Sequence, residues 1–151
     1  VGAEIGVAVK NVIAIACGIV EGKNLGDNAR AALITRGLSE IVKLGLAKGG
    51  RRETLMGLAG MGDLTLTCTA RQSRNYALGK AIGEGTDLDQ YLKGRITVAE
   101  GLSSSKSVTN LAEKLGIEMP ICSAICNILH NKAEIDDTIS SLLARPQKAE
   151  F

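Results

Sequence analysis

The sequence predicts an all-α fold, and three observations lead to this prediction. Hydrophobic residues recur at helical spacing along most of the 151 residues. The composition, 45% hydrophobic and 23% charged, is typical of a globular protein. Only the short runs 65–69 and 96–99 have the character of strands. Because no repeat or interdomain linker interrupts the chain, we expect residues 1–151 to form a single domain.

The first helix is expected over residues 4–21 and is apolar on most of its faces, which is typical of a central helix wrapped by others. Its apolar run from Ile5 to Val20 contains Lys10 and Asn11 near the middle. The run is shorter than the roughly 20 residues that cross a bilayer. We therefore predict a buried helix of a soluble protein, without membrane insertion.

Further helices follow from helical spacing and from the residues that begin and end helices. Asp27 or Asn28 is expected to cap the second helix, and Gly49 to end it. Gly116 should end a later helix, and Pro120 suits the first turn of the next. The inner side of the second helix carries four apolar residues, Leu33, Leu38, Ile41 and Leu44. The expected ranges are 29–48, a short turn at 53–58, 73–82, 87–93, 102–115, 120–131 and 134–144.

The charges argue against a nucleic-acid partner. The 18 basic and 16 acidic residues are spread along the chain, giving a net charge of +2 without a Lys/Arg block. The chain opens with Val and shows no charged leader followed by a cleavage site. We therefore expect a piece of a longer, cytoplasmic protein.

The four cysteines, at positions 17, 68, 122 and 126, are expected to be reduced and buried. Cys122, Cys126 and His130 recur every four residues, a spacing that suggests a metal site. On one continuous helix, however, Cys122 and His130 lie about 12 Å apart along the axis. Zinc bonds of about 2.0–2.3 Å cannot join three such ligands, so no metal site is predicted.

Three places carry polar residues in patterns that suggest chemistry. The first is Lys10-Asn11 within the apolar helix, where an ammonium group is costly without a partner and is suited to acid/base work. The alternative is that Lys10 extends its ammonium to the surface at a helix edge.

The second place is a glycine-rich loop that ends in Asp63. Gly57, Gly60 and Gly62 allow the backbone to approach a ligand closely, and Asp63 could meet a cation there. The spacing differs from that of a dinucleotide-binding fingerprint, and no strand precedes it. The alternative is a flexible turn.

The third place is the helix start at Ser73-Arg74-Asn75. Free N–H groups at a helix N-terminus and the planar Arg74 guanidinium both suit a phosphate dianion. The alternative is an ordinary capping segment with a solvated arginine. Together, the three places predict an anion pocket beside an acid/base lysine.

Several stretches resemble bacterial-type NAD(P)-dependent glycerol-3-phosphate dehydrogenase, and they occur in that family's order over nearly the whole chain. They are Gly6–Ile15, Gly26–Gly37, Gly57–Leu64, Thr67–Thr69, Ser73–Asn75, Val98–Gly101, Glu118–Ile121 and Leu142–Arg145. The resemblance is to the family's C-terminal, substrate-binding domain. It implies a multi-helix domain like the C-terminal domain of 6-phosphogluconate dehydrogenase-type enzymes.

The resemblance also implies a reaction. An N-terminal Rossmann domain, whose fingerprint is absent from this sequence, binds NAD or NADP in such enzymes. The enzyme transfers hydride reversibly between NAD(P)H and dihydroxyacetone phosphate, giving sn-glycerol 3-phosphate for phospholipid synthesis. This chain alone is then expected to be inactive and to need its own Rossmann domain as a partner.

The resemblance assigns roles to individual residues. Lys10 would be the general acid/base that protonates the substrate carbonyl oxygen. Asp63 would lie near that lysine and the substrate hydroxyls. Asn11 and Thr67 are further pocket candidates. The matches to the substrate-binding run are Ser73, Arg74 and Asn75, with Arg74 at the phosphate and close to the cofactor, and the matches to nucleotide contacts are Val98 and Glu100.

Two alternatives remain open at this point. One is a non-catalytic helical module that uses its apolar helices for dimerisation. The other is a different hydroxyacid or sugar-phosphate dehydrogenase of the same architecture. A homodimer is compatible with each of these, and the sequence does not distinguish NADH from NADPH.

Overall fold

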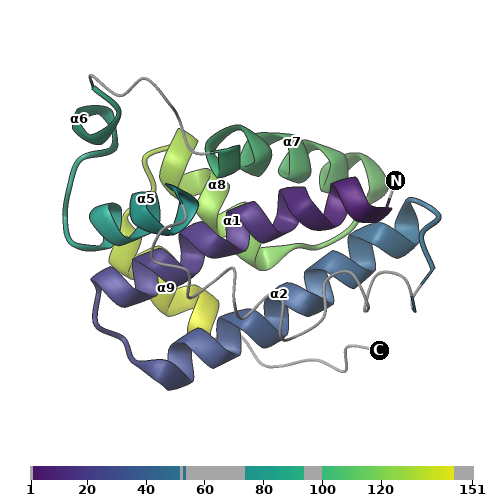
Figure 1. The fold of residues 1–151 in the computed structure, drawn as a ribbon, viewed down its shortest axis with the longest axis horizontal. Helices are drawn as coiled ribbons and strands as arrows, with labels where there is room; N and C mark the ends of the chain where they lie inside the picture. The colour runs from purple at the N-terminus through teal and green to yellow at the C-terminus, as the bar shows by residue number, and fades with distance from the viewer. Residues whose placement is uncertain (1, 52, 54–73, 94–99, 145–151) are drawn as a thin grey trace.

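The computed structural model describes residues 2–51, 53, 74–93 and 100–144, with side chains from residue 6 onward. Every element in this part of the chain is a helix, which confirms the predicted all-α fold (Figure 1). The short turn expected at 53–58, apart from Glu53, and the two possible strands lie outside the described residues. The helices are α1 (Gly2–Gly22), α2 (Asp27–Ala47), α5 (Arg74–Gly83), α6 (Leu88–Leu92), α7 (Glu100–Leu115), α8 (Pro120–His130) and α9 (Ile135–Ala144).

Helix α1 is the central element, as predicted. Every residue from 12 to 20 is buried, and α1 contacts α2, α5, α7 and α8. Figure 1 shows α1 passing between α7 on one side and α2 on the other. A helix surrounded in this way must be apolar on most of its faces, which explains its sequence. In the described part of the chain, no helix combines the length and the apolarity that crossing a membrane requires.

Glycines allow α1 and α5 to touch backbone to backbone. A Cβ atom placed on Gly79 of α5 would collide with the carbonyl oxygen of Ile15, and one on Gly18 of α1 would collide with that of Tyr76. One turn further along, a Cβ on Gly83 would lie 2.6 Å from the carbonyl oxygen of Ile19. Only glycine permits so close an approach. The position of α5, and of the residues at its start, is therefore fixed by α1.

The helix boundaries follow most of the expected signals. Gly49 and Gly116 adopt positive φ angles of 90° and 69° beyond α2 and α7, and Pro120 occupies the first turn of α8. The predicted inner residues of α2 are all buried: Leu33, Leu38, Ile41 and Leu44. These glycine, proline and core predictions are confirmed.

The predicted cap of α2 is wrong. The N-cap is Gly26, at φ 93°, and it makes no side-chain capping hydrogen bond. Asp27 already belongs to the first turn, where its carboxylate accepts a hydrogen bond from Arg30 at 3.3 Å. Arg30 also pairs with Glu21 of α1 at 2.6 Å. The Arg30–Glu21 ion pair joins the end of α1 to the start of α2, whereas the Asp27 carboxylate pairs with Arg30 within α2 and does not cap the helix.

The start of α8 is capped by a side chain from another helix. Its N-cap residue, Met119, makes no side-chain capping hydrogen bond. The carboxylate of Glu40 in α2 instead accepts hydrogen bonds from the N–H groups of Ile121 (2.7 Å) and Cys122 (3.2 Å). Glu40 is buried. It therefore satisfies two donors that the helix itself leaves without partners, and it ties α2 to α8.

Three of the four cysteines have the predicted character. Cys17, Cys122 and Cys126 are buried free thiols. Burial and the neighbouring Glu40 carboxylate raise the pKa of Cys122 well above its usual value. Such a thiol is protected from ionisation and behaves as a small apolar side chain. Cys68 lies outside the described residues.

Candidate functional site

Two hydrogen bonds bring candidate residues from three helices together. The backbone N–H of Gly101, in the first turn of α7, donates to Asn75 Oδ1, in the first turn of α5, at 2.7 Å. The Asn11 side chain of α1 donates from Nδ2 to Glu100 Oε2 at 3.4 Å. The pairs Lys10-Asn11, Arg74-Asn75 and Glu100-Gly101 are neighbours in sequence. The middle of α1 therefore meets the N-termini of α5 and α7 at one place.

The backbone is tightly packed where these helices meet. A Cβ atom on Gly101 would lie 2.6 Å from Ile15 Cδ1, 2.8 Å from Asn75 Oδ1 and 2.9 Å from the carbonyl oxygen of Asn11. The first turn of α7 is thus pressed against both α1 and α5. A rigid arrangement of this kind is what a binding site requires of the residues around it.

Lys10 is half-buried on α1, next to Asn11. It is neither enclosed in the core, as residues 12–20 are, nor fully exposed. It lies on the central helix, next in sequence to the Asn11 side chain that contacts α7.

Two helix N-termini bring partial positive charges to this place. The first N–H groups of a helix carry partial positive charge, and the hydrogen bond between Asn75 and Gly101 brings those of α5 and α7 together. Arg74, the first residue of α5, is exposed and adds a full positive charge. Glu100, the first residue of α7, is also exposed and supplies an acceptor beside them. Such a set can bind an anion and still orient a hydroxyl or amide group.

Several predicted residues lie outside the part that the structure describes. They are Asp63, Thr67, Ser73 and Val98, together with the glycine-rich loop at 57–62. The described candidates that come together are Asn11, Asn75 and Glu100, with Lys10 and Arg74 as their direct neighbours in sequence.

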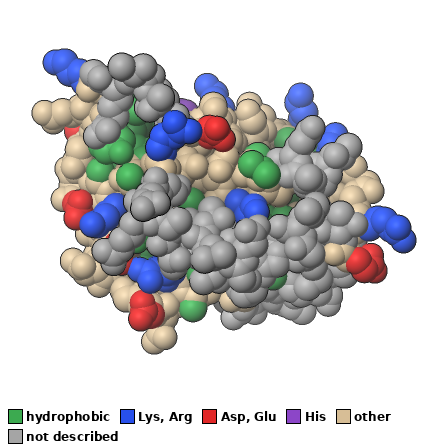
Figure 2. Space-filling model, viewed as in Figure 1, with side chains coloured by type: hydrophobic (Ala, Val, Ile, Leu, Met, Phe, Trp, Pro, Cys, Tyr) green, Lys and Arg blue, Asp and Glu red, His purple; other side chains and the backbone are tan. Residues whose placement is uncertain are grey.

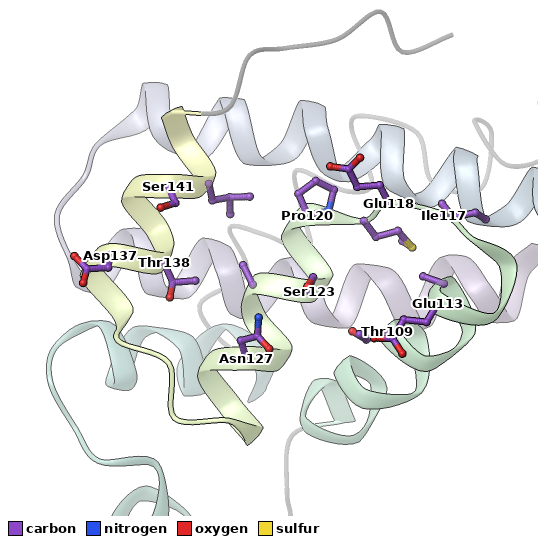
Figure 3. Close-up of a pocket in the computed structure, with 14 residues that line it drawn as sticks. Thr109, Glu113, Ile117, Glu118, Pro120, Ser123, Asn127, Asp137, Thr138 and Ser141 are labelled. Carbon is purple, nitrogen blue, oxygen red and sulfur yellow. The ribbon is translucent and has the colours of Figure 1, made fainter.

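A separate cavity, of about 590 Å³, opens between α7, α8 and α9 (Figure 3). None of the candidate residues lines it. Its lining includes the carboxylates of Glu113, Glu118 and Asp137, which would repel a phosphate ester. The cavity is therefore unsuited to the predicted anionic substrate.

A second hollow, of about 690 Å³, lies along α7 and begins at Glu100. Lys106 and His130 also line it, and the His130 ring contacts Ser105 Oγ at 3.0 Å and the carbonyl oxygen of Leu102 at 2.8 Å. On the face shown in Figure 2, basic and acidic side chains both occur around the edge of the molecule.

Within residues 2–51, 53, 74–93 and 100–144, no group of three or more His, Cys, Asp or Glu residues is arranged to hold a metal ion.

Sequence reasoning missed two residues that shape this architecture. One is Gly101, whose N–H group joins α7 to α5. The other is Glu40, which holds the start of α8. The burial of Glu40 could have been predicted from the sequence, because its spacing from Leu33, Gly37 and Leu44 places it on the buried face of α2.

The structure belongs to the class of all-α domains. In it, Lys10 on the central helix lies near the N-termini of α5 and α7, which a hydrogen bond between Asn75 and Gly101 joins. Residues 1–140 match the family described as NAD-dependent glycerol-3-phosphate dehydrogenase C-terminus. The chain belongs to this family, which confirms the resemblance found in the sequence.

Individual relatives agree with this assignment. The chain is 59% identical over 150 residues to a glycerol-3-phosphate dehydrogenase [NAD(P)+] from Rhodospirillum rubrum, covering 99% of this chain and 43% of that protein. It is 56% identical to the protein of the same name from Parvibaculum lavamentivorans, covering 99% and 45%. The chain thus spans less than half the length of these curated relatives.

Solved structures show the same fold. The crystal structure of glycerol-3-phosphate dehydrogenase from Coxiella burnetii is similar with a TM-score of 0.89 and 48% identity, over 95% of this chain and 44% of that one. Glycerol-3-phosphate dehydrogenase from Saccharomyces cerevisiae is similar with a TM-score of 0.79 and 31% identity, over 95% and 42%.

Proposed function

We propose that this chain is the substrate-binding domain of an enzyme that transfers hydride reversibly between NAD(P)H and dihydroxyacetone phosphate, giving sn-glycerol 3-phosphate for phospholipid synthesis. The observation that carries the proposal is the convergence of three helices, which joins Asn11 to Glu100 and Asn75 to Gly101. Family membership supplies the reaction, because the relatives are named for it.

Lys10 is the proposed acid/base. When hydride reaches the central carbon of dihydroxyacetone phosphate, the carbonyl oxygen becomes an alkoxide that must take up a proton. The Lys10 ammonium donates that proton, and in the reverse direction the neutral amine removes it from the hydroxyl group. A positioned proton donor of this kind contributes about 10²- to 10⁴-fold in rate. The rigid central helix holds the donor in place.

The phosphate group is proposed to bind at the start of α5. The exposed Arg74 guanidinium can form two parallel hydrogen bonds to phosphate oxygens. The N–H groups of the helix terminus add partial positive charge. We assign Ser73 and Asn75 to the same substrate contacts, and Asp63 to the substrate hydroxyls near Lys10.

The cofactor is proposed to be NAD or NADP, held mainly by an N-terminal Rossmann domain, and it supplies the hydride. Two of the described residues can contact polar groups of this cofactor. Arg74 can pair with a phosphate, and the exposed Glu100 carboxylate can accept hydrogen bonds from hydroxyl or amide groups. Val98 is assigned to the same side. We further propose a cytoplasmic location and a homodimer, without nucleic-acid partners or membrane insertion.

A chimera provides the test. This chain replaces the matching segment, 43% of the length, of the Rhodospirillum rubrum relative, and NAD(P)H oxidation is followed with dihydroxyacetone phosphate. We expect turnover with this substrate, and at least 100-fold lower kcat/KM with unphosphorylated dihydroxyacetone, because the anion contacts are lost. A folded chimera that prefers another sugar phosphate or hydroxyacid would show that the architecture is shared but the substrate is not.

A further inference from the structure

The hydrogen bond between Gly101 and Asn75 fixes how the Asn75 amide is turned. A backbone N–H can only donate, so the atom that it meets at 2.7 Å must be the carbonyl oxygen Oδ1. Asn75 is only 8% exposed, and this bond is buried. The side chain is therefore held in one orientation, and its other end, the Nδ2 amino group, remains a donor.

The same bond holds the start of α7. The first N–H groups of a helix lack partners within the helix, and Asn75 satisfies that of Gly101 from a different helix. Glu100 directly precedes Gly101, and its carboxylate has a second, longer contact with Asn11 at 3.4 Å. The shorter, buried bond is the stronger constraint, so the position of Glu100 depends chiefly on Asn75.

The first turn of α7 packs closely against α1 and α5. The neighbours of Gly101 leave no room for even a methyl group, since a Cβ there would lie 2.8 Å from Asn75 Oδ1 and 2.9 Å from the Asn11 carbonyl oxygen. Without the Asn75 oxygen, the Gly101 N–H group would be buried without an acceptor, and the turn would have to move outward to reach water.

We propose that Asn75 is a positioning residue for the cofactor side of the site as well as a substrate contact. This inference rests on the proposed function. The Oδ1 atom places Glu100 relative to Arg74 through Gly101, while Nδ2 donates to the anionic substrate. One amide thus sets the spacing between the groups that meet the substrate and those that meet the nucleotide.

Two substitutions separate the two ends of the amide. Asn75→Asp keeps an oxygen acceptor for Gly101 and replaces the Nδ2 donor with a negatively charged oxygen. Asn75→Ala removes both ends. In the chimera with the Rhodospirillum rubrum relative, Asn75→Asp should raise the KM for dihydroxyacetone phosphate about 10- to 100-fold and leave the KM for NAD(P)H within about twofold. Asn75→Ala should raise the KM for dihydroxyacetone phosphate and also the KM for NAD(P)H, the KM for NAD(P)H by about five- to tenfold.

Amide hydrogen exchange gives a readout that does not depend on activity. In the 151-residue chain, the Gly101 amide should be protected, should remain protected in Asn75→Asp and should exchange faster in Asn75→Ala, with circular dichroism as the check of folding. An unprotected Gly101 amide in the unsubstituted chain would overturn the proposal, whatever the variants do.

The KM for NAD(P)H in the two variants decides whether Asn75 acts on the cofactor side of the site. A KM for NAD(P)H that stays constant in Asn75→Ala, or rises equally in Asn75→Asp, would reduce Asn75 to a substrate contact alone. An inactive parent chimera would count against the proposed function, while the exchange measurement would still decide whether Asn75 holds α7.

Discussion

Replacing Glu40 with glutamine should change how folding stability depends on pH. The Glu40 side chain is 3% exposed and accepts two backbone hydrogen bonds from the start of α8. Burial raises its pKa from 4.5 to about 7, although the hydrogen bonds from Ile121 and Cys122 and the positive charge of Lys43 act to lower it. The fold therefore favours the protonated form of this carboxyl group.

The size of the effect follows from the two pKa values. A group whose pKa is higher in the folded state contributes its full stability below the unfolded-state pKa of 4.5, and the contribution is lost as the pH rises through about 7. One pKa unit corresponds to about 1.4 kcal/mol. The free energy of unfolding of the parent should thus fall by about 3 kcal/mol relative to Glu40→Gln between about pH 4 and about pH 8.

Urea unfolding followed by circular dichroism, at several pH values across this range, measures the difference. Comparing the two proteins at each pH cancels the titration of groups that they share. Glu113→Gln, which removes a carboxyl group at an exposed position on α7, is the matched control. A Glu40→Gln difference that is constant with pH would refute the reasoning.

Two further predictions concern the α1–α5 contact and the phosphate contact. Gly79→Ala should destabilise the fold by about 3 kcal/mol, because its Cβ would collide with the Ile15 backbone. Gly6→Ala, where a Cβ meets nothing within 4 Å, should be neutral or slightly stabilising, and equal losses in thermal unfolding would contradict this account. Arg74→Ala in the chimera should raise the KM for dihydroxyacetone phosphate about 10- to 100-fold without loss of stability, because the side chain is exposed. An unchanged KM would require another residue to bind the phosphate.

Much of the fold could be predicted because its signals are local. The central position of α1 could be predicted because apolar residues cover most of its faces. Gly116 and Pro120 mark helix ends through their own backbone preferences. The failed cap at Asp27 shows the limit of such signals. Its carboxylate had a second possible partner, Arg30, and the sequence alone did not rank the two.

The contacts between helices were harder to predict. The spacing of four residues between Gly18 and Gly22, and between Gly79 and Gly83, is visible in the sequence, but its pairing is not. The bond between Asn75 and Gly101 joins residues 26 positions apart and has no local pattern. The candidate residues were found one by one, whereas the way in which three helices unite them required the structure.

The role of Lys10 is the central claim, and the turnover of a Lys10→Met chimera tests it most directly. The kcat for dihydroxyacetone phosphate reduction should fall by about 10²- to 10⁴-fold with the fold retained, because the proton donor is lost. Lys48→Met, at an exposed position beyond α2, should leave kcat unchanged. A Lys10→Met enzyme that keeps its kcat would contradict the assignment of Lys10 as the acid/base.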